Sequence, residues 1–149
     1  MLKQLWLLPF LFTFLLLSGC ISAPVSAPNT VQVIRVIDGD TIVIEGGQHL
    51  RYIGMDTPEK GEAFYLESTE ANRRLVEGKR VRLVKDISET DRYGRLLRYV
   101  WVDDRMVNAE LVRIGMALAK AYPPDTRYQG YFEQLEKEAR TARRGIWAK

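Results

Sequence analysis

The chain has 149 residues, of which 46% are hydrophobic and 28% are charged, and this composition is typical of one globular domain rather than of a disordered chain. Its formal net charge of +3 favours an anionic partner without requiring one. A single cysteine excludes an internal disulfide framework, and a single histidine argues against multi-histidine zinc sites and histidine-dependent serine or cysteine triads.

Residues 1–19 have the features of a signal peptide. Lys3 provides a short positive start, and residues 5–17 form an apolar run that is too short to span a bilayer comfortably. The ending Leu-Ser-Gly-Cys is similar to a bacterial lipobox, which predicts cleavage before Cys20 and lipidation of that cysteine. A plain signal peptide with a chance cysteine and an N-terminal anchor helix are the alternatives.

Residues 20–30 predict a flexible tether, because prolines and small polar residues cannot bury enough apolar surface to fold. Acyl chains on Cys20 would make membrane attachment stable. We therefore expect an extracytoplasmic protein that is lipid-anchored to the cell envelope, in the outer membrane or on the outer face of the plasma membrane. In a cell with two membranes, Ile21 after the cysteine favours the outer one.

Residues 31–149 are expected to form the folded domain, which begins with β-rich sequence. Runs of β-branched side chains predict strands, and Gly46 with Gly47 predicts a hairpin turn between the second and the third. Five strands are predicted, at residues 31–37, 41–45, 49–53, 80–85 and 96–102.

Three helices accompany these strands. An apolar stripe of Phe64, Ala71 and Leu75 predicts a helix over residues 62–77, with Gly78 as its C-terminal glycine. The other two helices are predicted at residues 108–115 and 127–143. Five short strands with a helix after the third predict a five-stranded Greek-key barrel of the OB type, an α+β and mostly β fold. The lack of βαβ alternation argues against a doubly wound fold.

Carboxylates and guanidinium groups gather in three segments, D-G-D-T at 38–41, R-Y-I-G-M-D-T-P-E at 51–59 and D-R-Y-G-R at 91–95. Asp40 closes a turn at the start of the second strand, and Asp56 is expected to end the strand that pairs with it. Both carboxylates would then meet at one end of the barrel. Two such ligands, with backbone carbonyls and water, are what Ca²⁺ or Mg²⁺ accepts.

The neighbouring side chains suit hydrolysis of a phosphodiester. Thr57 precedes a proline and is held extended with its carbonyl available, whereas Glu59 lies in a loop where it could orient or deprotonate a water molecule. Arg51 and Arg95 could hold the phosphate oxygens and stabilise the leaving oxygen. Taken singly, each segment is also compatible with an ordinary turn, a helix start or a solvated strand residue, so the functional interpretation depends on their order and spacing.

The ordered motifs V-I-D-G-D-T, R-Y-I-G-M-D-T-P-E, D-R-Y-G-R-L, M-V-N-A-E-L-V-R-I-G and the final G-I-W resemble the staphylococcal nuclease (thermonuclease) family. The likeness covers nearly all of residues 31–149. It implies that Asp40, Asp56 and the Thr57 carbonyl hold one Ca²⁺ ion. The members of this family cut DNA and RNA, prefer single strands and leave 3′-phosphate ends, and a monomer is the default for them.

The same resemblance implies the catalytic roles. Glu59 would be the general base that acts on water, and Arg51 and Arg95 would bind the scissile phosphate, with Arg95 near the leaving oxygen. Tyr93 and Tyr122 are candidates for stacking on a nucleotide, because an aromatic platform accepts any base. Packing of either tyrosine in a partly buried position is the alternative, and the Tyr-Pro-Pro-Asp stretch departs from the family's spacing.

Two other functions remain open on the sequence. The first is an inactive OB-type domain that only binds nucleic acid or a protein ligand. Such a domain is expected to lack some of the site residues, whereas all five charged ones are present here. The second is a surface lipoprotein whose metal site only stabilises the fold, and this leaves Arg51 and Arg95 without a role.

Overall fold

A computed structural model describes residues 30–148. The predicted signal peptide, the lipidation at Cys20 and nearly all of the tether lie outside the described residues. Thr30, which was expected to end the tether, is instead the first residue of strand β1 (Thr30–Val36), where it pairs with Arg82. Within the described residues, no helix is both long and apolar enough to cross a bilayer.

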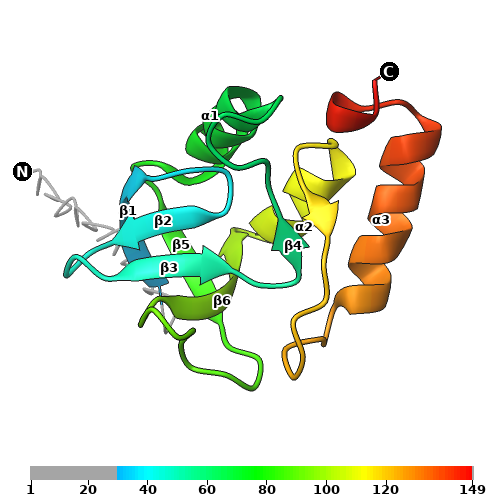
Figure 1. Cartoon of the computed structure of the whole chain (residues 1–149). Coiled ribbons are helices and arrows are strands. Elements are labelled where there is room, and N and C mark those ends of the chain that lie inside the picture. Colours follow the sequence, from blue (N-terminus) through cyan, green and yellow to red (C-terminus); the bar gives the residue numbers. More distant parts are fainter. Residues whose placement is uncertain (1–29, 149) are drawn as a thin grey trace, which may run out of the picture.

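The predicted five-stranded barrel with three helices is confirmed (Figure 1). Four antiparallel pairs join its strands, and a parallel pair between the third and the last long strand closes it, so the barrel is mixed. Its long strands are β1, β2 (Thr41–Ile44), β3 (His49–Tyr52), β5 (Arg80–Val84) and β6 (Leu96–Val102).

Buried β-branched and leucine side chains form the interior of the barrel. Ile42, Leu50, Val81 and Val100 come from four different strands, and all are fully buried. Gly46 and Gly47 lie in the turn that connects β2 to β3, and their φ angles of 84° and 80° are ones that glycine adopts without strain. The backbone N of Gly47 donates to Ile44 O at 3.0 Å and closes this turn.

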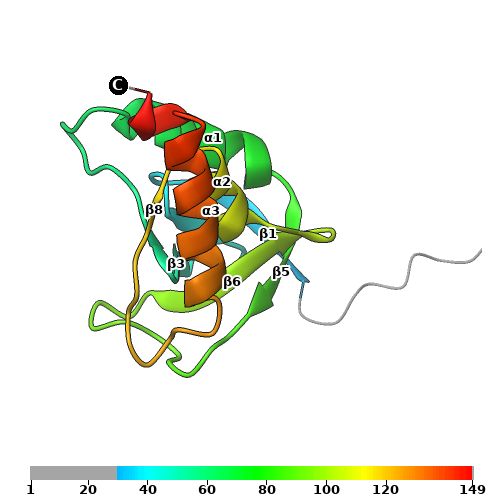
Figure 2. The ribbon, with the colours of Figure 1, turned by 90° about the vertical axis from the view of Figure 1, so that its right-hand side faces the viewer.

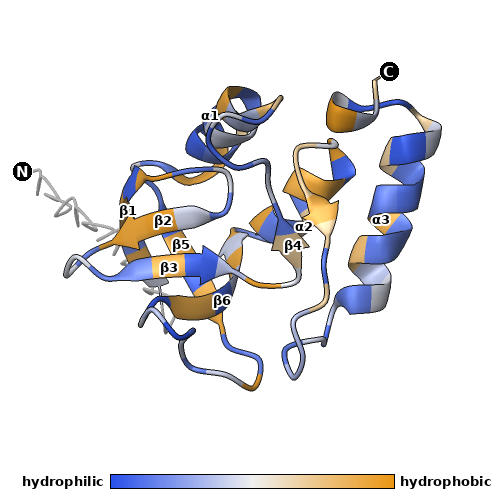
Figure 3. Cartoon of the chain, in the orientation of Figure 1, coloured by the Kyte–Doolittle hydropathy of each residue, from blue (hydrophilic) through white to orange (hydrophobic). Residues whose placement is uncertain are grey.

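The helices cover one side of the barrel. Helix α2 (Val107–Arg113) packs between the barrel and the outer helix α3 (Gln129–Thr141), and a short 3-10 helix η1 (Gly145–Trp147) follows, as Figures 1 and 2 show. In Figure 3, α3 is mostly hydrophilic and β2 mostly hydrophobic, as expected for an outer helix and an inner strand.

Helix α1 (Tyr65–Val76) differs from its prediction in two respects. It begins three residues later than expected, because Phe64 adopts a left-handed conformation with φ 68° and precedes the first turn. Its buried face is mainly polar, consisting of Ser68, Thr69, Asn72 and Val76, and the predicted stripe of apolar residues is only half-buried. The C-terminal Gly78 has a φ of 71°, as predicted for the residue after a helix.

Three two-residue strands were not predicted: β4 (Met55–Asp56), β7 (Arg105–Met106) and β8 (Leu118–Ala119). The prediction that Asp56 ends the strand paired with β2 is therefore wrong. The chain leaves β3 at Tyr52 and turns at Gly54, whose φ is 81° and where a Cβ would lie 2.3 Å from the ring of Phe132. Asp56 then lies on β4, which pairs with β8 rather than with the barrel.

Candidate active site

Arg51 joins the two carboxylates that the sequence proposed as metal ligands. Its Nη1 lies 2.7 Å from Asp40 Oδ1, and its Nη2 lies 2.7 Å from Asp56 Oδ1. The register of β2 and β3 explains the first contact, since Thr41 pairs with Arg51 and Asp40 immediately precedes Thr41. Asp40 and Asp56 therefore lie on the same side of the barrel, on either side of one guanidinium group.

Asp40 is buried and held by several donors. Its Oδ1 accepts from Thr41 Oγ1 at 3.0 Å, and its Oδ2 accepts from the backbone N and the Oγ1 of Thr57 at 3.3 and 3.1 Å. Burial raises the pKa of Asp40 to about 6, in spite of Arg51, and the nearby charge of Asp38 adds to the rise. The Asp40 carboxylate is thus poorly compensated in this structure, and a bound cation would lower the cost of its negative charge.

The turn that carries Asp40 is fastened to helix α1. Asp40 N donates to Asp38 Oδ1 at 3.1 Å, Asn72 Nδ2 donates to Asp38 O at 2.9 Å, and Tyr52 Oη donates to Asn72 Oδ1 at 2.9 Å. Between the two aspartates, Gly39 approaches Thr57 so closely that a Cβ would lie 2.7 Å from its Oγ1. The sequence analysis gave no role to Tyr52, which lies within a quoted motif, and it did not single out Asn72, because no spacing signal reveals a polar residue on the buried face of a helix.

Lys120 is a further residue of the site that the sequence analysis missed. Its Nζ lies 2.7 Å from Asp56 Oδ2, and this hydrogen bond raises the pKa of Lys120. The strand pair β4–β8 brings the two together across 64 positions of the chain, and Lys120 N donates to Gly54 O at 3.0 Å. Because this pairing is non-local, no local motif predicts it.

Asp91 organises the loop that carries Arg95. Its Oδ2 lies 2.7 Å from Arg95 Nε, and its Oδ1 accepts from the backbone N of Arg95 and of Tyr93 at 3.0 and 2.9 Å. Burial opposes ionisation of Asp91, but these hydrogen bonds outweigh it and lower the pKa of Asp91. Asp91 lay within a quoted motif but was given no role, and the structure shows that it positions Arg95.

Both arginines and both candidate tyrosines line one cavity of about 360 Å³. The guanidinium carbon of Arg51 lies 5.9 Å from the ring centre of Tyr122, and that of Arg95 lies 5.5 Å from the ring centre of Tyr93. Tyr93 is 68% exposed, so it is not packed in the core, and the guanidinium carbon of Arg92 lies 4.8 Å from its ring centre. The cavity therefore combines cationic forks with aromatic surfaces.

Glu59 lies outside this cavity. It is exposed, and it lines a second hollow of about 610 Å³ together with Asp56 and Thr57. Its backbone N donates to Glu62 Oε2 at 2.7 Å, and among the described residues its carboxylate forms no ion pair. The Arg51–Asp56 ion pair is the element common to both hollows, since Arg51 lines the first and Asp56 the second.

The donor set fits a hard divalent cation. Across residues 30–148, no three acidic, histidine or cysteine side chains gather closely enough to form a metal cluster. The candidate ligands are the two carboxylates of Asp40 and Asp56, which meet at Arg51, and the carbonyl of Thr57, which follows Asp56 in the chain. Ca²⁺ and Mg²⁺ both accept such oxygen ligands and complete their coordination with water.

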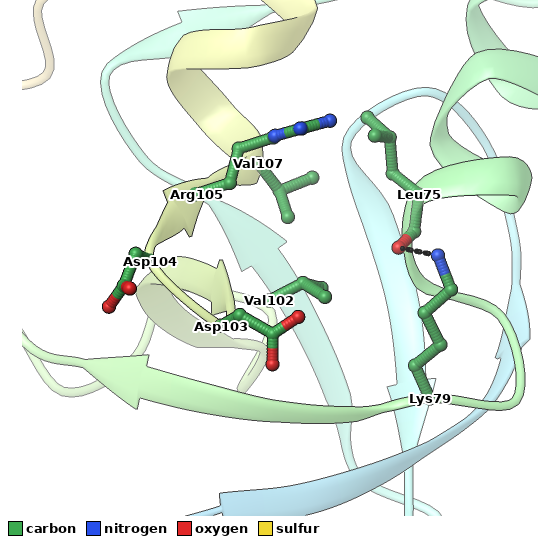
Figure 4. A pocket seen from close by; sticks show the side chains of 7 residues that line it. All are labelled: Leu75, Lys79, Val102, Asp103, Asp104, Arg105 and Val107. Atoms are coloured by element: carbon green, nitrogen blue, oxygen red, sulfur yellow. Dashed lines mark hydrogen bonds between the residues drawn. The ribbon is translucent and has the colours of Figure 1, made fainter.

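A third hollow, of about 570 Å³, contains none of the predicted site residues. It lies between the end of α1 and the β6–β7 hairpin, and its lining includes Lys79, Asp103 and Arg105 (Figure 4). Figure 2 shows this hairpin on the opposite side of the molecule from β8. Lys79 Nζ donates to the carbonyl oxygens of Leu75 and Arg74 at 2.8 and 2.9 Å, so this ammonium group caps the helix end.

Comparison with known proteins shows the family of this chain. The profile described as "Staphylococcal nuclease homologue" matches residues 49–149, which is more than half of the chain. The chain belongs to the staphylococcal nuclease family. The chain is similar to a thermonuclease of Staphylococcus hyicus, with which it is 41% identical over 138 residues. This match covers 85% of this chain and 82% of that protein.

Two further relatives of the chain are also named as nucleases. A thermonuclease of Staphylococcus intermedius is 41% identical over 124 residues, covering 77% of this chain and 74% of that protein. Endonuclease YncB of Bacillus subtilis is 37% identical over 130 residues, covering 80% of this chain and 62% of that protein. The chain is thus homologous to phosphodiester hydrolases.

Proposed function

We propose that this chain is a Ca²⁺-dependent nuclease that hydrolyses DNA and RNA, prefers single strands and leaves 3′-phosphate products. The observation that carries the proposal is the convergence of Asp40 and Asp56 on Arg51, at 2.7 Å in each case. This arrangement supports a cation site directly beside a guanidinium that can bind phosphate. Homology to thermonucleases and endonucleases supports the same reaction class.

Asp40, Asp56 and the carbonyl of Thr57 would hold the Ca²⁺ ion. When bound, the ion supplies polarisation of a phosphoryl oxygen and offsets the negative charge that develops there. The raised pKa of Asp40 supports this assignment, because burial leaves its carboxylate short of positive charge. Asn72 keeps this ligand in place through the Asp38–Asp40 turn.

The protein side chains perform the remaining steps. Glu59, which forms no ion pair within the described part of the chain, takes the proton of the attacking water or orients that water. Arg51 and Arg95 bind the non-bridging phosphate oxygens and the leaving oxygen. A guanidinium has five N–H donors, and the contacts of Arg51 with Asp40 and Asp56 use two of them.

Tyr93 and Tyr122 support the preference for single strands. Their rings line the cavity that holds both arginines, and a base can stack on them only after it leaves a duplex. This stacking needs no hydrogen-bond readout of the base, so it accepts DNA and RNA of any sequence.

The location and assembly of the protein are part of the proposal. Lipidation at Cys20 would anchor a monomeric nuclease domain outside the cytoplasm, attached to the outer membrane or to the outer face of the plasma membrane. The basis is the Leu-Ser-Gly-Cys ending of the apolar N-terminal segment.

Cleavage of single-stranded DNA by the purified protein tests the proposed activity. We expect hydrolysis with Ca²⁺, none with a chelator, 3′-phosphate ends on the products, and a loss of kcat of at least about 100-fold in Glu59→Ala. Glu67→Ala, which removes an exposed carboxylate on α1 that does not line the hollow beside Glu59, is the matched control. Binding of DNA without cleavage would instead identify a nucleic-acid-binding domain, and full activity in Glu59→Ala would refute the general-base role.

A further inference from the structure

The hollow beside Glu59 has one polar wall and one apolar wall. Asp56, Thr57 and Glu59 form the polar wall, which belongs to the proposed catalytic centre. The apolar wall is contributed by three separate parts of the chain, namely the segment before α1, strand β8 and η1. Its residues are Pro58, Ala63, Phe64, Leu118 and Ile146.

This hollow and the tyrosine cavity lie on either side of the Arg51–Asp56 ion pair. Arg51 Nη2 and Asp56 Oδ1 are 2.7 Å apart, with Arg51 in the lining of the tyrosine cavity and Asp56 in that of the apolar hollow. A phosphodiester held at Arg51 carries one nucleoside on each side of its phosphorus. If Tyr93 and Tyr122 receive one of these nucleosides, the other extends toward the apolar hollow.

The charges of the hollow identify the chemical class of its ligand. Three carboxylates line it, those of Asp56, Glu59 and Glu62, and its lining includes no lysine or arginine. Asp56 is paired with Arg51 and Lys120, whereas Glu59 and Glu62 form no ion pair among the described residues, so a phosphate would be repelled beside these two glutamates. An uncharged group with apolar faces is compatible with the apolar wall, and its N–H donors can reach a carboxylate at the rim, which describes a nucleobase.

Phe64 gives independent support for a binding role. It has a φ of 68°, and a bulky residue in this left-handed region is strained by about 1 kcal/mol or more. Its ring lines the hollow and remains half-buried, although the backbone could adopt this φ more easily with glycine. Leu118 faces the same hollow from β8 and is 37% exposed. An aromatic residue and an exposed leucine thus form an apolar surface next to the proposed general base.

We propose that this hollow is a second nucleobase subsite, which binds the base on the side of the scissile phosphate opposite to the Tyr93–Tyr122 cavity. The inference rests on the proposed nuclease function, because the position of the scissile phosphate at Arg51 defines the two sides. The enzyme then holds the substrate by the bases on both sides of the bond that it cuts.

The dinucleotide TpT tests this subsite, because it contains a single phosphodiester. Two analogues each lack one thymine, either on the 5′ or on the 3′ side of the phosphate. In the wild-type protein we expect each deletion to lower kcat/KM about tenfold, as is typical for the loss of one stacked base. In Leu118→Ala and in Phe64→Gly, we expect one of the two thymine deletions to lower kcat/KM no further, whereas the other still lowers it about tenfold. The loss of kcat/KM that a deletion causes is called its penalty. In Tyr93→Ala the pattern is reversed.

Leu66→Ala is the matched control, since Leu66 is 74% exposed on α1 and does not line the hollow, and it should leave both penalties unchanged. Phe64→Gly relieves the strained φ, so it provides a variant that does not depend on the stability of β8. The inference is overturned if Leu118→Ala and Phe64→Gly change the rates of all three substrates equally, or change none of them.

Equilibrium binding separates this inference from the proposed function. Calorimetry measures the Kd of TpT and of its two analogues in the presence of a chelator, where no cleavage is required. If Leu118→Ala binds TpT and one of the two analogues with equal Kd, whereas the wild-type protein binds that analogue more weakly than TpT, the result supports the subsite even in a protein that proves inactive. Equal Kd values for TpT and both analogues refute the subsite, whereas the absence of cleavage refutes only the nuclease proposal.

Discussion

Asp56 has both carboxylate oxygens occupied by cations. Arg51 binds one and Lys120 the other, each at 2.7 Å. Asp40, in contrast, has Arg51 as its only ion-pair partner among residues 30–148, and burial raises its pKa to about 6. A divalent ion that uses both carboxylates must therefore compete with Lys120 for Asp56. At Asp40 the ion would instead offset the unfavourable burial of the ionised carboxylate. Single side chains thus decide how strongly the site can bind a cation.

Lys120→Met should strengthen Ca²⁺ binding, because it removes the cation that competes for Asp56 Oδ2. Lys120 is half-exposed, and exposed ion pairs contribute about 0.2–1 kcal/mol, so we expect Kd for Ca²⁺ to fall by at most about fivefold. Isothermal titration calorimetry of the metal alone measures this change. Lys137→Met on the exposed side of α3 controls for the altered net charge. Weaker Ca²⁺ binding in Lys120→Met would show that Lys120 supports the shape of the site instead.

At the scale of elements, helix α1 acts as a polar support for the site. Its buried face carries Ser68 and Asn72, which bond to Met116 O and to Asp38 O at 2.8 and 2.9 Å. A helix packed only by apolar contacts would leave the carbonyl of Asp38 without this donor. The polar face therefore connects the orientation of α1 to the turn that carries Asp40.

Asn72→Ala should lower the free energy of unfolding by about 1–3 kcal/mol, because it leaves the buried Tyr52 hydroxyl and the Asp38 carbonyl without their partner. Urea denaturation followed by circular dichroism measures the change. Leu66→Ala on the exposed side of the same helix should change the value by less than about 0.5 kcal/mol. Equal effects of the two substitutions would mean that the Asn72 hydrogen bonds contribute no net stability.

A second connection joins two loops through Asp125. Its Oδ1 accepts from the backbone N of Ile87 and of Ser88 at 2.9 and 2.8 Å. Burial opposes the ionisation of Asp125, but the hydrogen bonds from Ser88 and Ile87 outweigh it and lower the pKa of Asp125. The residues that precede the Arg95 turn are thereby held against the Tyr122–Asp125 turn.

Asp125 should make stability depend on pH in the acid range. A carboxyl group whose pKa is lower in the folded state stabilises the protein above its unfolded pKa of about 3.9, and this contribution is lost as the pH falls through the folded value. We expect Asp125→Asn to cost about 1–3 kcal/mol at pH 7 and progressively less below pH 4. Denaturant titrations at both pH values measure this difference. A cost independent of pH would indicate that only the shape of the side chain matters.

At the scale of the whole molecule, the site lies on one side of the domain and the start of β1 on another. Strand β1, which the N-terminal residues precede, pairs with β5 at Thr30 and Arg82, whereas the site lies where β3, β4 and β8 meet. Figure 2 shows β8 and the start of β1 on different sides of the domain. A tether before Thr30 would therefore leave the mouth of the site accessible.

The proposed anchor is tested on the full chain produced in a bacterium. We expect the wild-type protein to incorporate labelled palmitate and to sediment with membranes, and Cys20→Ala to incorporate none, because the only cysteine is the acyl acceptor. Ser22→Ala in the same segment serves as the control and should behave as the wild type. A wild-type protein that is soluble and unlabelled would contradict the lipoprotein proposal and leave the nuclease proposal intact.

The amino-acid sequence by itself determined the five long strands, the Gly46–Gly47 hairpin, the glycine after α1 and the family. Each of these depends on local information, namely β-branched runs, residues that tolerate positive φ, and motifs of adjacent residues. It also identified Asp40 and Arg51 as neighbours, because β2 and β3 are consecutive strands joined by a short hairpin. Asp56 was expected at the same place, but it reaches Arg51 from β4, which pairs with β8.

Only the tertiary structure decided which other residues complete the site. Lys120 reaches Asp56 through the β4–β8 pair, and Asn72 reaches Asp38 across 34 positions of the chain, so neither contact leaves a local pattern. The division of the site into a tyrosine cavity and an apolar hollow likewise depends on β8 and η1 packing beside the segment before α1. Pairing between distant segments is settled by burial and hydrogen bonding in the folded chain, and this is why spacing alone did not predict it.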